Sequence, residues 1–166
     1  MKRFIAVLAL LIICASACFS AVFPNSFRAS VSLGGRDDGM LQTSLSLAAA
    51  PFHFNFMTPF VLGTAYVQLS DTKLEFGGLR AGLGFDIMYI KDHPFAFLSA
   101  NPTVWSPSIA GGIDYEDKAL RGFIEISLFR FMEKDAIYEY MVPFCDLSES
   151  GIDRIGVLVF RFSGLF

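Results

Sequence analysis

The last fifteen residues alternate between two kinds of side chain, and this period of two constrains the fold more than any other feature. Apolar side chains occupy one face of 152–166, and polar groups fall on the other. Strict alternation is typical of a β-strand. Chain ends usually fray in water, so a long apolar strand ending on an aromatic residue indicates a terminus that is held in a sheet. The apolar face comprises Leu158, Phe160, Phe162 and Phe166, and the other comprises Val157, Val159, Arg161, Ser163 and Leu165.

The same alternation recurs along the chain and predicts an antiparallel all-β protein. Clusters of Gly, Asp and Ser separate the alternating segments and indicate turns between strands. The segment 132–151 is acidic and predicts the longest connection, with some strand character around 138–142. We expect eight strands, at 27–33, 41–49, 61–69, 79–89, 95–100, 108–115, 120–129 and 152–166.

The polar faces of these strands favour a barrel in lipid over a barrel in water. Both kinds of barrel alternate polar and apolar residues, but a water-facing side usually carries long Lys and Glu side chains. Here the polar positions are mostly Ser, Gly, Ala, Thr and Gln. Hydrophobic residues make up 54% of the chain and charged residues only 17%. After the N-terminal segment, no apolar run reaches the roughly 18 residues of a membrane helix. This combination predicts a transmembrane β-barrel.

A set of charged residues falls on the predicted inner face. Four are basic and three are acidic, which is nearly balanced, as buried charges require. We therefore predict a charge network that fills and plugs the lumen, with a narrow ion path as the alternative. Its members are Arg28, Arg80, Asp86, Asp114, Arg121, Glu125 and Arg161.

Aromatic residues cluster next to the connections 51–59, 91–94 and 116–118. In an up-and-down barrel whose N-terminus is periplasmic, all three would lie on the periplasmic side. The clustering predicts one interfacial girdle of aromatic side chains. Its members are Phe52, Phe54, Phe56, Phe60, Tyr89, Phe95, Phe97 and Tyr115.

The first residues have the organisation of a secretory signal peptide. Lys2 and Arg3 precede an uncharged run over 4–13, and small residues follow it. We expect a signal peptide at 1–20 and the barrel at 21–166. The run is long enough to remain as an uncleaved anchor, which stays an alternative. The segment 15–18 resembles a relaxed lipoprotein box, so Cys18 is a possible lipidation site.

The rest of the sequence gives little support for catalysis or nucleic-acid binding. Removal of the leader takes away two of the 13 basic residues and none of the 16 acidic ones, which disfavours nucleic acid as a partner. His53 and His93 lie next to predicted turns, without a carboxylate at triad or metal-ligand spacing. We expect no enzyme activity, no cofactor and no metal. The acidic segment 132–151 could bind an extracellular ligand, although such stretches are usually solvated loops.

The whole pattern is similar in size and strand number to the small OmpA/OmpX-type outer-membrane barrels of bacteria. The terminal strand resembles the C-terminal strand of that class, which the barrel-assembly machinery recognises. Gly164 departs from the larger apolar residue that is common there. The resemblance implies an eight-stranded antiparallel up-and-down transmembrane barrel in the outer membrane of a diderm bacterium, in contact with its lipid. It also implies a structural or surface-interaction role and an assembly signal formed by Leu158, Phe160, Phe162 and Phe166.

Two other classes remain as alternatives. A secreted or lipid-anchored lipocalin-like protein would bind an apolar ligand inside the barrel and expose its Ser-rich faces to water. A lipid-modifying barrel enzyme would use His53 or His93. The sequence 53–55, His-Phe-Asn, loosely resembles the His-x-Ser segment of lipid A deacylase barrels but lacks the serine.

Overall fold

The computed structural model describes residues 27–50, 57–70, 73–87, 89–91, 103–133 and 135–165, and these residues form an all-β protein. In this part of the chain no helix is long and apolar enough to cross a membrane. Ten strand segments are present: β1 (Phe27–Arg36), β2 (Leu41–Ala49), β3 (Thr58–Ser70), β4 (Lys73–Asp86), β5 (Val104–Trp105), β6 (Ser108–Glu116), β7 (Ala119–Ser127), β8 (Phe129–Met132), β9 (Ala136–Ser148) and β10 (Gly151–Leu165).

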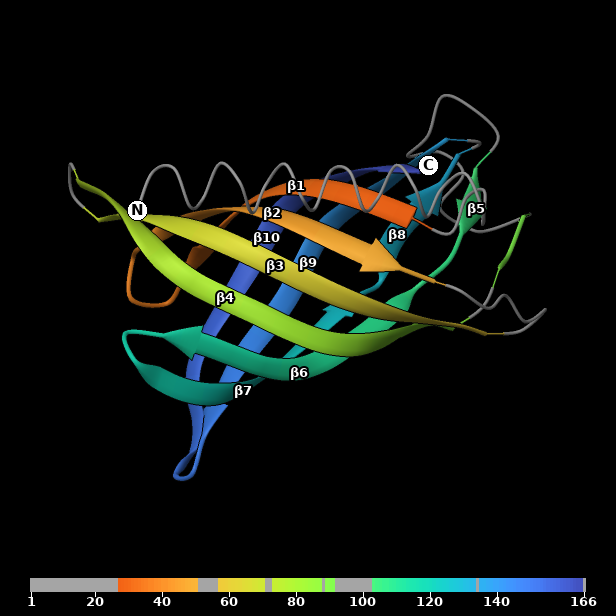
Figure 1. Cartoon of the computed structure of the whole chain (residues 1–166). Coiled ribbons are helices and arrows are strands. Elements are labelled where there is room, and N and C mark those ends of the chain that lie inside the picture. The colour runs from red at the N-terminus through yellow and green to blue at the C-terminus, as the bar shows by residue number, and fades with distance from the viewer. Residues whose placement is uncertain are drawn as a thin grey trace.

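The segments close into an antiparallel barrel of eight strands (Figure 1). The ring runs β1–β2–β3–β4–β6–β7–β9–β10, and β10 pairs with β1 to close it. β7 and β8 are two parts of one barrel strand, because both pair with β9 and only Leu128 separates them. β5 and β6 likewise form two parts of one barrel strand, because β5 pairs with β8 and β6 pairs with β7. The prediction of an eight-stranded antiparallel barrel is confirmed.

The two ends of the barrel differ in their connections. At one end, which we call the turn end, four hairpins close through the segments 37–40, 71–72, 117–118 and 149–150. The connections 37–40, 117–118 and 149–150 lie toward the left and bottom of Figure 1. At the other end, the terminal end, β1 begins, β10 finishes, and the segments 50–57, 87–107 and 133–135 connect the strands. The longer connections therefore share one end with both termini of the barrel.

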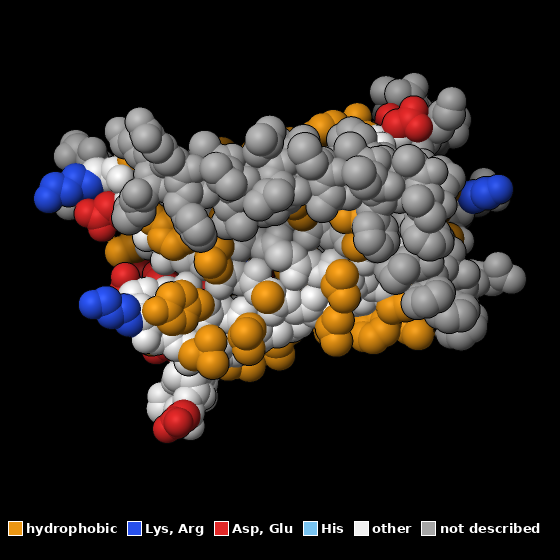
Figure 2. All heavy atoms as spheres, viewed as in Figure 1, with side chains coloured by type: hydrophobic (Ala, Val, Ile, Leu, Met, Phe, Trp, Pro, Cys, Tyr) orange, Lys and Arg blue, Asp and Glu red, His pale blue; other side chains and the backbone are white. Residues whose placement is uncertain are grey.

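The barrel wall is apolar outside and polar inside. Many Leu, Ile, Val and Phe side chains on the outer wall are exposed, with Leu83 at 62%. In Figure 2, apolar side chains form patches on the visible part of the wall, and charged side chains lie toward the two ends. Buried positions are held instead by Ser, Thr, Gln, Arg, Asp and Glu. This is the reverse of a water-soluble barrel, in which the apolar face points inward.

Paired bulges in β9 and β10 change which residues point inward. Gly34 pairs with Leu158, but Leu33 pairs with Phe160, so Val159 is an extra residue in β10. Val159 and Phe160 are both exposed, at 54% and 37%, whereas Leu158 is only 2% exposed and lies inside. The prediction that Leu158 shares a face with Phe160 and Phe162 is therefore wrong. A bulge inserts one residue and so reverses the alternation.

One strand assignment also differs from that expected. The segment predicted as a long acidic connection, 132–151, contains β9, which spans the whole barrel wall. Its acidic residues Glu139 and Asp146 point into the barrel and are buried, so they do not mark a solvated loop. The predicted strand 95–100 lies outside the described residues. The count of eight is right because β9 takes its place in the ring.

Three members of the predicted aromatic girdle, Phe60, Tyr89 and Tyr115, lie in the described part of the chain. Phe52, Phe54, Phe56, Phe95 and Phe97 lie outside the described residues. Phe60 is buried inside the barrel, and Tyr115 lies at the turn end, so neither joins a girdle at the terminal end. Instead, outward-facing rings pair across β9 and β10, with Tyr138 5.5 Å from Phe162 and Tyr140 5.4 Å from Phe160 between ring centroids.

Candidate functional site: a polar lumen crossed by ion pairs

All seven arginines in the described part of the chain take part in ion pairs associated with the lumen. The lysines described there, Lys73, Lys91 and Lys118, are exposed at strand ends and connections. Arginine suits the interior because its planar guanidinium forms several hydrogen bonds to carboxylates at fixed angles and is less strongly hydrated than an ammonium group. The ion-paired arginines are Arg28, Arg36, Arg80, Arg121, Arg130, Arg154 and Arg161.

A chain of six alternating charges crosses the lumen in its terminal half. Glu125 on β7 accepts two hydrogen bonds from Arg161 on β10, at 2.7 and 2.9 Å. Arg161 lies 3.5 Å from Glu139 on β9, which in turn lies 3.4 Å from Arg130 on β8. We call this chain the terminal network. It ends where Asp86 on β4 lies between Arg130, at 3.2 Å, and Arg28 on β1, which donates two hydrogen bonds to it.

Neutral groups complete this network. Arg130 donates to the backbone carbonyl of Ser106 at 2.9 Å and contacts the Ser106 hydroxyl at 3.1 Å. The guanidinium of Arg28 lies over the ring of Phe60, 5.0 Å from its centroid. These contacts hold the arginines against the wall, so the paired charges are fixed across the lumen.

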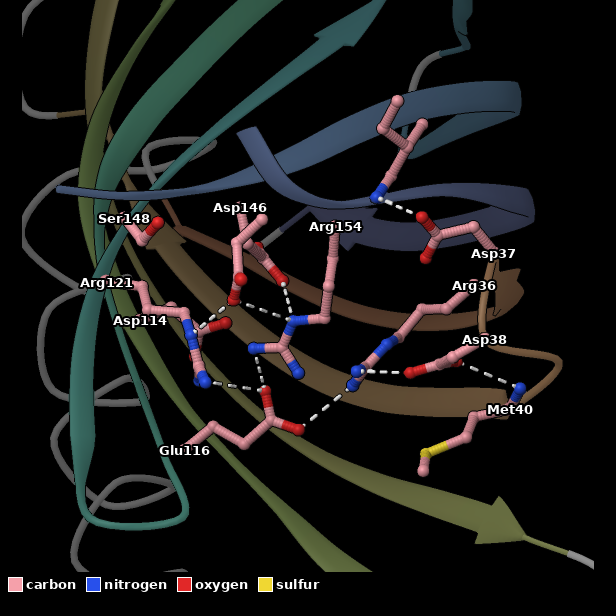
Figure 3. A network of polar contacts seen from close by, with 12 residues as sticks. Arg36, Asp37, Asp38, Met40, Asp114, Glu116, Arg121, Asp146, Ser148 and Arg154 are labelled. Carbon is pink, nitrogen blue, oxygen red and sulfur yellow. Dashed lines mark hydrogen bonds and ion pairs between the residues drawn. The ribbon is translucent and has the colours of Figure 1, made fainter. Parts of the chain in front are cut away.

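A second network, the turn network, lies toward the turn end (Figure 3). Arg80 on β4 bridges Asp114 on β6 and Asp146 on β9, with distances of 3.1 and 2.8 Å. Arg154 on β10 contacts both Asp146 and Glu116. Arg36, Arg121 and Gln68 also contact Glu116, at 2.9, 3.7 and 3.0 Å. Arginine side chains from β1 and β10, the two strands whose pairing closes the barrel, thus share the carboxylate of Glu116.

Three carboxylates of the turn network lie close enough to raise the possibility of a metal. Candidate ligand atoms of Asp114, Glu116 and Asp146 fall within 4.8 Å of one another. Each carboxylate already contacts at least one guanidinium. The positive charge that a cation would supply is therefore already provided by arginine, and the geometry describes an ion-pair network.

A small apolar cluster lies inside the barrel on the neighbouring strands β9 and β10. Val142, Phe144 and Leu158 form a cluster in which every member is at most 2% exposed. Phe144 packs where Gly156 on the neighbouring strand has no side chain, so the ring lies directly over the backbone. We call these three residues the collar.

A small polar cavity remains within the terminal half of the lumen. Its volume is about 40 Å³, which leaves room for about three water molecules. Arg28, Arg161 and Glu139 contribute charge to its wall, and serine and threonine hydroxyls supply further polar groups. The lining hydroxyl residues are Ser30, Ser46, Thr64, Ser108 and Ser163. The cavity is far smaller than the 300–1,000 Å³ of a typical small-molecule pocket.

The structure distributes the predicted lumen charges over both networks. Arg28 contacts Asp86, Arg161 contacts Glu125, and both pairs belong to the terminal network. Arg80 contacts Asp114 in the turn network. Arg121 contacts none of these six; it lies 2.8 Å from Asp153 and 3.7 Å from Glu116.

Sequence reasoning missed six members of these networks. Arg36 was assigned to a turn, Glu139 and Asp146 to a connection, and bulges disturb the alternation around Arg154. The separate distribution of arginine and lysine was the signal that could have found the basic members. The six are Arg36, Glu116, Arg130, Glu139, Asp146 and Arg154.

The other predicted residues lie as follows. Phe160 and Phe162 face outward on β10, 37% and 41% exposed, whereas Leu158 is in the collar. Phe166 lies outside the described residues. So do Cys18, the signal peptide, His53 and His93.

Comparison with known proteins supports the fold alone. No protein-family model matches the sequence, and no curated protein matches it. One similar solved structure comes from work on the de novo design of transmembrane β-barrels, with a TM-score of 0.52 and 11% sequence identity. The match covers 86% of this chain and 97% of the designed one. The fold is that of a transmembrane β-barrel.

Proposed function

We propose that this protein is an integral barrel of the outer membrane of a diderm bacterium, with a closed lumen and a structural or surface-interaction role. The observation that carries the proposal is the inverted wall, apolar outside and charged inside. Exposed apolar residues stabilise a barrel surrounded by lipid, whereas in water they would promote association. Assembly through the C-terminal strand and export by the leader belong to the same proposal.

The closed lumen is supported by the two networks and the collar. A lipocalin-like protein needs an apolar interior for its ligand, and the described interior holds ion pairs instead. A porin needs a continuous aqueous path, and the ion pairs across the lumen and the apolar side chains of the collar favour a filled cross-section instead. The role then comes from the barrel's surface and ends.

Cell fractionation and a charge placed on the wall test the membrane location together. Leu83 pairs with Val61 and Gly111 in the middle of the wall, and Arg there would cost about 2–4 kcal/mol in lipid. We expect the wild type in the outer-membrane fraction with heat-modifiable migration, and Leu83→Arg in reduced folded yield. Ser150→Arg, at the exposed β9–β10 turn, is the matched control and should assemble normally. A detergent-free, soluble wild type would refute the proposal.

Conductance in planar bilayers tests the closed lumen separately. The folded wild type should add no steady conductance above that of the lipid. Reproducible open channels would instead favour the narrow ion path, without affecting the membrane location.

A further inference from the structure

Arg80 lies inside an enclosure of rings and carboxylates. Its guanidinium carbon is 5.1 Å from the ring centroid of Tyr66, 5.3 Å from that of Phe123 and 4.6 Å from that of Phe144. Two carboxylates, Asp114 and Asp146, complete the surroundings, and Arg80 is 5% exposed. Three aromatic faces with added negative charge are the surroundings that favour an organic cation.

Two sides of the enclosure have supports that do not involve Arg80. The Tyr66 hydroxyl donates to Asp114 at 2.9 Å, and the Tyr66 ring packs against the backbone of Gly77 and Gly78. Asp146 is also held by Arg154, at 3.4 Å. These two sides should therefore keep their positions without the guanidinium.

The remaining two rings are seated in the same manner. The Phe144 ring packs against Gly156, and the Phe123 ring lies against Gly82 on β4. Because a glycine has no side chain, each ring fills the space directly above its neighbour's backbone. Rotation of the ring into the space left by Arg80 would leave a void over that backbone, which opposes collapse of the enclosure.

We propose that this enclosure is a binding site for guanidinium-type organic cations that the protein's own Arg80 occupies. In the native protein the tethered guanidinium closes the lumen at this level and excludes external cations. Removal of the side chain beyond Cβ leaves a site of matching size, lined by three rings and two carboxylates. The inference does not depend on the membrane location, because the enclosure lies wholly within the barrel.

The test uses Arg80→Ala in the full chain, folded in detergent micelles. Millimolar guanidinium chloride or methylguanidinium should raise its thermal midpoint by about 5 °C relative to sodium chloride at the same ionic strength. Wild type should not respond, because its site is filled. Arg121→Ala is the matched control, because Arg121 also contacts carboxylates but its side chain is 21% exposed and lies in the open part of the turn network. It too should show no guanidinium-specific rise.

A second variant tests the role of the rings. Arg80→Ala with Phe144→Leu removes the closest ring and keeps both carboxylates, and it should weaken guanidinium binding about tenfold by calorimetry. Equal stabilisation of Arg80→Ala and Arg121→Ala would overturn the proposal, as would equal effects of sodium and guanidinium. Failure of Arg80→Ala to fold even with guanidinium would also overturn it, because the walls would then depend on the tethered side chain.

Discussion

At the scale of the residue, the interior depends on charges that are satisfied in pairs. Asp86 shows the arrangement most clearly, because it is fully buried and lies between Arg28 and Arg130. A buried ion pair contributes little net stability compared with apolar packing, yet loss of one partner leaves an uncompensated charge. Single neutral substitutions in the networks should therefore cost more than the pairs themselves contribute.

Asp86→Asn is the sharpest form of this prediction. The amide keeps the shape of the carboxylate but leaves buried Arg28 without its counter-charge and Arg130 with Glu139 alone. We expect the free energy of unfolding to fall by about 3–5 kcal/mol, measured by urea titration of the barrel folded in lipid vesicles. Glu149→Gln, in the exposed β9–β10 turn, removes the same charge and should change stability by less than about 0.5 kcal/mol. Equal effects of the two changes would contradict the network.

Close packing around residue 156 requires a glycine at that position. A Cβ there would collide with the Phe144 ring and with the backbone carbonyl of Gly35. Gly156→Ala should therefore destabilise the barrel by about 1–3 kcal/mol in the same titration, because the collar ring must move. Gly63, on the outer wall of β3, has open space at its Cβ, and Gly63→Ala should be neutral or slightly stabilising. A similar loss in both variants would show that the strand backbone, and not the ring, sets the cost.

At the scale of the element, periodicity predicted strands well wherever the alternation was unbroken. β1, β2, β6 and β7 match the expected ranges closely, because each alternates an apolar outer face with an inner face that is mostly polar or small. β9 was missed for a physical reason. Its inward face carries Glu139 and Asp146, which resemble loop residues until their arginine partners from other strands are known. Met141, at φ 51°, then breaks the period in mid-strand.

The pairs of the lumen were harder to predict than its composition. Sequence alternation placed Arg28 and Asp86 on inner faces, but they are 58 residues apart and meet only through the barrel's curvature. The register that brings Arg161 to Glu125 depends on the bulge at Val159, which no turn residue or glycine announces. Which charges pair depends on how strands that are distant in the sequence are aligned in the barrel. The alternation along one sequence does not specify that alignment.

The bulge in β10 makes a prediction that simple alternation contradicts. Without it, Val159 would share the lumen face with Arg161; with it, Val159 faces outward like Phe160. The test introduces Val159→Trp or Phe160→Trp into a Trp105→Phe background. We expect brominated acyl chains to quench the tryptophan fluorescence of both variants to a similar extent, because both side chains would contact lipid. Strong quenching of the tryptophan at residue 160 with none at residue 159 would support strict alternation and contradict the bulge.

At the scale of the whole molecule, the asymmetry of the two ends decides where partners can approach. The turn end offers only hairpin connections of two to four residues, at 37–40, 71–72, 117–118 and 149–150. The longer connections, 50–57 and 87–107, lie with the barrel's termini at the other end. In an outer-membrane barrel with periplasmic termini, the surface outside the cell would thus consist of tight turns. A large loop-borne ligand site outside the cell has no support in this arrangement, because the segment 132–151 forms the wall.

Three exposed lysines test the orientation that the proposed outer-membrane location implies. Lys73 and Lys118 lie at the turn end, whereas Lys91 lies in the connection at the terminal end. A membrane-impermeant amine reagent added to intact cells should modify Lys73 and Lys118 and spare Lys91, as read by mass spectrometry of the tryptic peptides. Cells broken before labelling are the control, and all three lysines should then react. Selective modification of Lys91 in intact cells would invert the proposed orientation and place the longer connections outside. Equal modification of all three in intact cells would mean that no membrane separates the two ends, which contradicts a barrel that spans it.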